Sequence, residues 1–77
     1  MMSMQAIETM EQLGRAIRTR RKERGYTQAT VAAYAGCSAR FLSELERGKC
    51  TAEMGKALRV IEILGMDLFI EPRGARQ

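Results

Sequence analysis

The 77-residue chain has no histidine and only two cysteines, Cys37 and Cys50, and these shortages exclude several kinds of chemistry. Neither cysteine has a neighbour at the spacing of metal ligands, so one chain is not expected to hold a metal ion. Without histidine the commonest general base is missing, and no serine or cysteine has an evident partner to activate it. We therefore predict a protein with no metal, no cofactor and no enzymatic activity, and with two ordinary reduced thiols.

Long apolar runs are also missing, since no segment approaches the roughly 20 consecutive apolar residues that a membrane-spanning helix needs. Residues 1–10 are rich in methionine, but they lack the basic region and the continuous apolar stretch of an export signal. We therefore expect a cytoplasmic protein with no membrane partner.

Positive charge, in contrast, is in excess. The sequence has 13 lysines and arginines against 9 acidic residues, and its formal net charge is +4. Such an excess suits a polyanionic partner such as nucleic acid. The length is near the lower limit at which one hydrophobic core gives comfortable stability, so association with a second subunit is expected.

Glycines divide the chain into short segments of helical periodicity, which end at Gly25, Gly36, Gly48 and Gly65. Each segment begins at a serine or threonine that can cap a helix, and Thr9 with Gln12 has the pattern of a capping box. The predicted helices cover residues 9–24, 27–35, 38–47 and 51–64. In the last of these, a helical period is followed by the apolar positions Met54, Ala57, Leu58, Ile61 and Leu64.

The segment after Gly65, residues 66–71, alternates in part between apolar and polar side chains and ends before Pro72, which favours a strand. A lone strand leaves its backbone donors and acceptors unpaired, so its natural partner is the same segment of a second chain. We therefore predict a two-fold homodimer held through Met66, Leu68, Phe69 and Ile70. Residues 1–8 are predicted to be an N-terminal arm, residues 9–71 the folded domain and residues 72–77 a flexible basic tail.

Residues 27–48 have the pattern of two short helices joined by a tight turn. Small Ala32 lets the helices approach each other, and Gly36 can adopt the positive φ of the turn. Leu42 and Leu45 anchor one side of the second helix. The opposite side is predicted to stay open, and it carries Ala39, Arg40, Ser43, Glu44 and Arg47.

The same residues match the pattern TQ-x3-A-x3-G-x-S-x3-L-S-x-L-E-x-G, and so resemble the phage repressor and Cro-like (XRE-type) helix-turn-helix family. The ending LGMDL at residues 64–68 resembles the HipB-type antitoxins, in which a fourth helix runs into a dimerising strand. The resemblance covers residues 10–71. It implies an all-α, lambda-repressor-like four-helix DNA-binding domain with a short C-terminal β-strand that pairs across a two-fold dimer.

The resemblance implies that the open surface binds double-stranded DNA. Gln28 would contact a phosphate, Arg40 would read a guanine, and Ala39 would touch a thymine methyl group. The residues implied in DNA binding are Thr27, Gln28, Ser38, Ala39, Arg40, Ser43, Glu44, Arg47, Lys49, Thr51 and Arg18. Plain structural explanations compete for some of them, because Gln28 can simply begin a helix, Thr51 can simply cap one, and Arg18 can belong to a solvated face.

Two glutamates on the second helix of the motif have different expected roles. Glu44 departs from the family, whose members more often have a neutral polar residue here. It can accept a hydrogen bond from a cytosine amino group, or it can orient Arg40 one turn earlier, and both alternatives stay open. Glu46 resembles a near-standard glutamate of the family that pairs with an arginine of the first helix, so the resemblance implies a structural ion pair with Arg21.

The leading functional hypothesis is a sequence-specific transcriptional repressor that acts as a homodimer on a palindromic operator. The resemblance further implies the antitoxin of a toxin-antitoxin operon, with a HipA-like kinase toxin as partner. Two alternatives stay open. One is a stand-alone regulator with no toxin, and the other is a protein-interaction module that captures a partner through residues 66–71, with DNA binding secondary.

Overall fold

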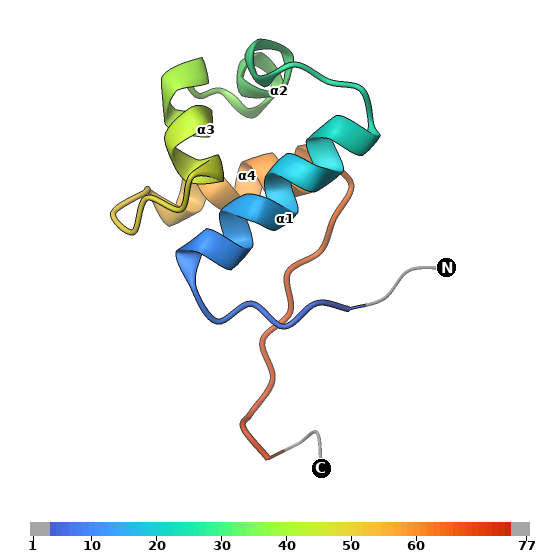
Figure 1. Ribbon diagram of the computed structural model, residues 1–77, viewed down its shortest axis with the longest axis vertical. Helices are drawn as coiled ribbons and strands as arrows, with labels where there is room; N and C mark the ends of the chain where they lie inside the picture. Colours follow the sequence, from blue (N-terminus) through green and yellow to red (C-terminus); the bar gives the residue numbers. More distant parts are fainter. Residues whose placement is uncertain (1–3, 75–77) are drawn as a thin grey trace.

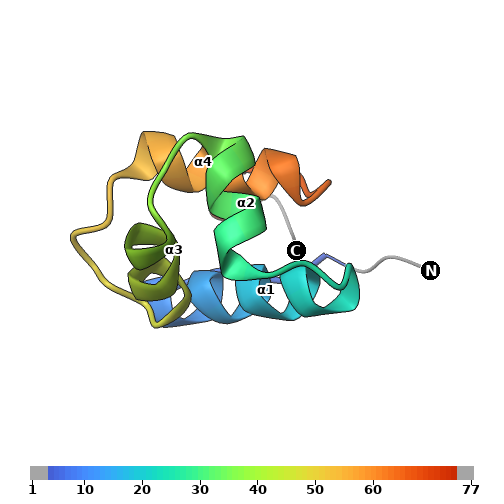
Figure 2. The ribbon, with the colours of Figure 1, turned by 90° about the horizontal axis from the view of Figure 1, so that it is seen from above.

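The computed structural model describes residues 4–74, which form four α-helices (Figure 1). They are α1 (Met10–Glu23), α2 (Gln28–Ala35), α3 (Ala39–Glu46) and α4 (Met54–Ile63). Seen from above, α1 and α4 lie on opposite sides of the molecule, and α2 and α3 lie between them (Figure 2). The prediction of an all-α domain with four helices is therefore confirmed for the described residues.

The first three helices begin at the capping residues that the sequence predicts. Thr9 Oγ1 accepts a hydrogen bond from the Gln12 backbone N–H, and the Gln12 side chain accepts one from the Thr9 backbone N–H in return. Thr27 and Ser38 cap α2 and α3 in the simpler way, by accepting from the backbone three residues ahead. These local hydrogen bonds fix where α1 and the two helices of the motif, α2 and α3, begin.

The beginning of α4 differs from the prediction, because Thr51 does not cap it. α4 begins at Met54, and residues 49–52 instead form a turn in which the Ala52 N–H donates to the Lys49 carbonyl. Ala57, Val60, Ile61 and Leu64 follow the spacing of one helical face and fill the core. Met54 and Leu58, the other two apolar positions of the expected period, lie on the flank of that face and are 44% and 45% exposed.

The core lies where the four helices meet. Its largest fully buried side chains are Ile17, Leu42, Leu45, Leu64, Val31 and Val60. A very close approach between α1 and α3 at Gly14 adds to this packing. A Cβ atom at Gly14 would collide with the carbonyl oxygen of Leu45 and lie 2.6 Å from that of Glu46. The absence of a side chain at Gly14 thus lets α3 pack directly on α1.

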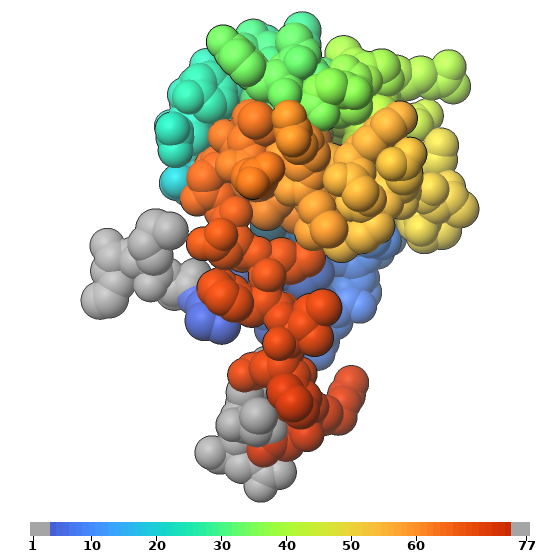
Figure 3. Space-filling view, turned by 180° about the vertical axis from the view of Figure 1, so that it is seen from behind, coloured from blue at the N-terminus to red at the C-terminus, as the bar shows by residue number. Residues whose placement is uncertain are grey.

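Residues 66–71 do not form a strand, and no strand occurs within residues 4–74. The prediction of a strand is wrong for the single chain, because a strand exists only through ladder hydrogen bonds to a neighbour and this segment has none. It runs down from α4 across the back of the molecule (Figure 3) and lines a groove together with residues of the N-terminal arm and α1. Leu68, Phe69 and Ile70 are 37%, 68% and 96% exposed, whereas Met66 packs against the core.

Residues 1–3 of the predicted arm and 75–77 of the predicted tail lie outside the described part of the chain. Within the described part, no helix combines the length and the apolar character needed to span a membrane.

Candidate nucleic-acid interface

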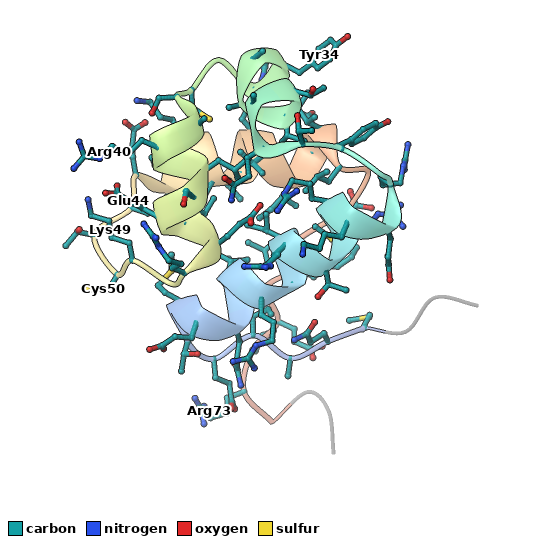
Figure 4. The ribbon with its side chains drawn as sticks, turned by 45° about the horizontal axis from the view of Figure 1, so that its top comes forward. Tyr34, Arg40, Glu44, Lys49, Cys50 and Arg73 are labelled. Carbon is teal, nitrogen blue, oxygen red and sulfur yellow. The ribbon has the colours of Figure 1, made fainter. Side chains whose placement is uncertain are left out.

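The outward face of α3 is the side of the helix that lies opposite its buried leucines. Leu42 and Leu45 are fully buried against the other helices. On the other side, Ala39, Arg40 and Arg47 are exposed and Ser43 and Glu44 are half-buried. Figure 4 shows Arg40 and Glu44 along this face, which is open to a ligand as the sequence predicts.

Three charged side chains on and beside this face form a contiguous group, which we name the Glu44 cluster: Arg40, Glu44 and Lys49. Arg40 Nε donates to Glu44 Oε2 at 3.4 Å, and Lys49 Nζ donates to Glu44 Oε1 at 3.1 Å. The hydrogen bond from Lys49 is the main reason that the pKa of Glu44 is lowered, and Arg40 lowers it further. Glu44 is therefore ionised at neutral pH and in contact with two cations.

A buried ion pair fixes α3 to α1. Arg21 Nε and Nη2 donate to the two carboxylate oxygens of Glu46 at 2.6 and 3.0 Å, and the two residues are only 8% and 6% exposed. Arg21 Nη1 also donates to the Tyr26 carbonyl at 2.9 Å. The hydrogen bonds from Arg21 to Glu46 raise the pKa of Arg21, so the guanidinium stays charged. The pair has the geometry that the family resemblance implies, and it links α1, the loop before α2, and α3.

Gln28 belongs to this buried network. Its Nε2 donates to Glu46 Oε1 at 3.0 Å, so the amide group of Gln28 is directed towards α3 inside the motif. The predicted phosphate contact of Gln28 therefore has to involve its remaining polar groups or a change of rotamer. Sequence reasoning missed this hydrogen bond, because nothing in the spacing of residues 28 and 46 indicates that they meet.

The other residues implied in DNA binding differ in how near they lie to α3. Lys49 and Thr51 are exposed in the loop that follows α3, and Lys49 also donates its backbone N–H to the Glu44 carbonyl. Thr27 and Ser38 begin the two helices of the motif. Arg18 is exposed on α1 and forms no hydrogen bond or ion pair with the Glu44 cluster among the described residues.

α1 carries a run of basic residues, Arg15, Arg18, Arg20, Arg21 and Lys22. Two of them have hydrogen-bond partners inside the domain. One is Arg21, and the other is Arg20, whose Nε donates to the Leu64 carbonyl at the end of α4 at 2.9 Å. An arginine at a helix carboxyl end satisfies a carbonyl that has no partner in the helix. Sequence reasoning missed this role, because the run by itself resembles a solvated basic face.

The two cysteines are free and occupy different environments. Cys37, in the turn before α3, is half-buried, and this burial raises the pKa of its thiol. Cys50 is exposed in the loop after α3, next to Lys49 (Figure 4).

Two short capped helices, α2 and α3, joined by a tight turn at Gly36, with α3 open on its polar side, have the arrangement of a helix-turn-helix DNA-binding protein. Residues 12–68 match the family model described as "Helix-turn-helix domain", and the chain belongs to this family. It is 39% identical over 71 residues to the "Uncharacterized HTH-type transcriptional regulator y4mF" of Sinorhizobium fredii, a match that spans 92% of this chain and 93% of that protein. The protein is thus an XRE-like helix-turn-helix transcriptional regulator.

Among solved structures, the fold matches that of HipB. A chain of a HipA-HipB-O2-O3 complex superposes with a TM-score of 0.83 at 20% identity, covering 91% of this chain and 99% of that one. A HipB variant in complex with an O2 20mer gives a TM-score of 0.83 at 22% identity, with coverages of 92% and 99%. At these identities the match establishes the fold.

Proposed function

We propose that the protein is a sequence-specific transcriptional repressor that binds a palindromic operator as a homodimer. The observation that carries this proposal is the outward face of α3, where the Arg40 side chain is 88% exposed and its Nε contacts the Glu44 carboxylate. The exposed edge of an arginine fits the O6 and N7 acceptors of guanine in the major groove. Such a contact distinguishes a specific reader of DNA from a protein that only binds phosphates.

Base contacts and phosphate contacts come from different parts of the motif in this proposal. Ala39, Arg40 and Ser43 are on the side of α3 that would face the bases, with Ser38 at its start. The phosphate contacts come from residues at the ends of the motif and beside it: Thr27, Gln28, Arg47, Lys49, Thr51 and Arg18. Contacts of this second kind fix the register on the duplex and add the salt-dependent part of the affinity.

The homodimer is supported by the apolar surface at the carboxyl end of the domain. Phe69 and Ile70 are more than two-thirds exposed, and Leu68 is more than one-third exposed. A chain of this size has little core area to spare, so burial of these side chains against a second copy would stabilise both subunits. A two-fold dimer presents two α3 helices related by symmetry, which is the reason for a palindromic site.

The test is competition binding on the DNA upstream of the protein's own gene, measured by fluorescence anisotropy. We expect this duplex to bind at least roughly 1,000-fold more tightly than a scrambled duplex of equal length, with a steep decrease in affinity as salt increases. Equal affinity for the two duplexes at moderate salt would refute the repressor proposal.

We also propose that the protein is the antitoxin of a toxin-antitoxin operon and binds a HipA-like kinase toxin. This second proposal rests on the fold match with a chain of a HipA-HipB complex, which covers nearly the whole of both chains. Co-expression with the product of the neighbouring gene tests it. We expect a complex that survives gel filtration and relieves growth inhibition by that product. Absence of a complex would favour the stand-alone regulator, whereas a complex without DNA preference would favour the protein-interaction module.

A further inference from the structure

The arrangement of the Glu44 cluster bears on how the protein selects its site. Glu44 Oε1 accepts from Lys49 Nζ and Glu44 Oε2 accepts from Arg40 Nε, so each carboxylate oxygen already has a cationic donor. Lys49 is fixed at its backbone too, since its N–H donates to the Glu44 carbonyl at 3.1 Å. The carboxylate is therefore held from the loop side as well as from α3.

Arg40 is bound at one atom only. The hydrogen bond and ion pair to Glu44 involve Nε, and no hydrogen bond or ion pair of the two Nη groups is found among the described residues. Its side chain is 88% exposed, against 25% for Glu44. The Nη edge, which is the pair of donors that matches the O6 and N7 acceptors of guanine, thus stays free.

A bare carboxylate on this face would be repelled by the phosphates of DNA, but Lys49 offsets that charge. A cytosine amino group would have to share an oxygen with one of these two cations, on a carboxylate side chain that is only 25% exposed. The contacts therefore favour support of Arg40 over direct contact between Glu44 and a base.

We propose that Glu44 is a positioning residue for specificity: it holds Arg40 by Nε, with its own charge offset by Lys49, so that the Nη edge of Arg40 meets a guanine. Glu44 itself contacts no base. This inference rests on the proposed DNA-binding function and deepens it. Ordering a long side chain before binding also reduces the conformational entropy that the complex would otherwise lose.

The test is a double-mutant cycle on a duplex selected from a random library by the wild-type protein. The variants are Glu44→Gln, Arg40→Ala and the double substitution, and Glu62→Gln on the exposed side of α4 is the charge-matched control. We expect Glu44→Gln to weaken binding by roughly 3- to 10-fold in the wild-type background and to have little effect once Arg40 is alanine. Lys49→Gln, which removes both the charge that offsets Glu44 and a proposed phosphate contact, should weaken binding whether residue 40 is arginine or alanine.

The base preferences separate positioning from direct contact. A repeated selection with Glu44→Gln should give the same preferred base at every base pair. The strength of the preference should decrease only at the guanine read by Arg40. Loss of a cytosine preference at another base pair would overturn this inference but not the proposed function. The same would follow if Glu44→Gln weakened binding equally with and without Arg40. Tighter binding by Glu44→Gln would overturn it as well, because the carboxylate would then only repel DNA. A wild-type protein that selects no sequence would overturn the proposed function and this inference together.

Discussion

At the scale of single residues, the side chains of α3 divide by the side of the helix that they occupy. Leu42, Leu45 and Glu46 face inward and fix the helix, whereas Arg40 and Glu44 face outward. Among the inward residues, Glu46 is charged and pairs with Arg21, which is also buried. The charges of Arg40 and Glu44 on the outward side are accessible to solvent. Substitutions on the two sides should therefore affect different properties of the protein.

Replacement of Arg40 by alanine should reduce specificity without reducing stability. Because the side chain is 88% exposed, its loss leaves the core intact. The binding free energy for the selected duplex should become less favourable by roughly 1 to 3 kcal/mol, with a much smaller change on random DNA. Anisotropy titrations measure both values, and Arg59→Ala on α4 is the control for the loss of one positive charge. Equal losses on the two duplexes would exclude Arg40 from base reading.

Replacement of Glu46 by alanine should have the opposite profile, with a large effect on stability. It leaves the Arg21 guanidinium buried without its partner and removes the acceptor of the Gln28 amide. The free energy of unfolding should decrease by about 3 to 5 kcal/mol, measured by urea denaturation. The double substitution Arg21→Met with Glu46→Leu should recover most of the loss, because no unpaired charge remains. A decrease below about 1 kcal/mol for Glu46→Ala would contradict a structural role.

At the scale of elements, the capping residues carried most of the predictive information. Thr9, Thr27 and Ser38 mark helix starts because their hydroxyls satisfy local backbone donors, and such local effects can be read from a short stretch of sequence. Thr51 has the same side chain but lies in a turn. α4 begins after Glu53 with no side-chain capping hydrogen bond, so a capping pattern does not locate its start, although the apolar period of the helix was readable from the sequence.

Replacement of a glycine by alanine within a helix usually stabilises a protein. The close crossing of α1 and α3 predicts the opposite effect at Gly14. Gly55→Ala in α4 introduces a Cβ atom whose nearest contact is 3.5 Å away, so it should stabilise the protein by up to about 1 kcal/mol through helix propensity. Gly14→Ala places the Cβ atom against the carbonyls of α3 and should destabilise the protein by roughly 1 to 3 kcal/mol instead. Thermal unfolding of the two variants compares these values. Stabilisation by Gly14→Ala would mean that α3 does not lie so close to α1.

At the scale of the whole molecule, the limit of sequence reasoning lies at the carboxyl end. The alternation over residues 66–71 indicated a strand, but pairing is a property of two segments and the single chain supplies only one. More of the candidate site than of this carboxyl-terminal segment could be predicted from the sequence, because residues 27–48 contain both the helix-turn-helix motif and its exposed face. The contacts of Gln28 and Arg20 were not predictable, since they join residues far apart in the chain.

The exposed apolar end of the domain predicts a dimer that a single charge disrupts. Ile70 is 96% exposed, so Ile70→Asp should leave the fold of one subunit unchanged. In a dimer held through residues 66–71 it would bury a carboxylate without a partner, so the variant should sediment as a monomer. Tyr34→Glu, which adds a charge at a 70% exposed position on α2, should remain dimeric. A dimeric Ile70→Asp variant would show that another surface, such as the flank of α4, holds the subunits together.

Interference by guanine methylation tests most directly the central claim that two α3 helices of a dimer enter the major groove. Methylation at N7 blocks the acceptor that Arg40 would use. We predict that methylated guanines prevent binding in two clusters separated by about one helical turn, roughly 34 Å along the duplex, and that Arg40→Ala removes this pattern. Binding that is insensitive to N7 methylation, or a single cluster with no symmetric mate, would contradict it.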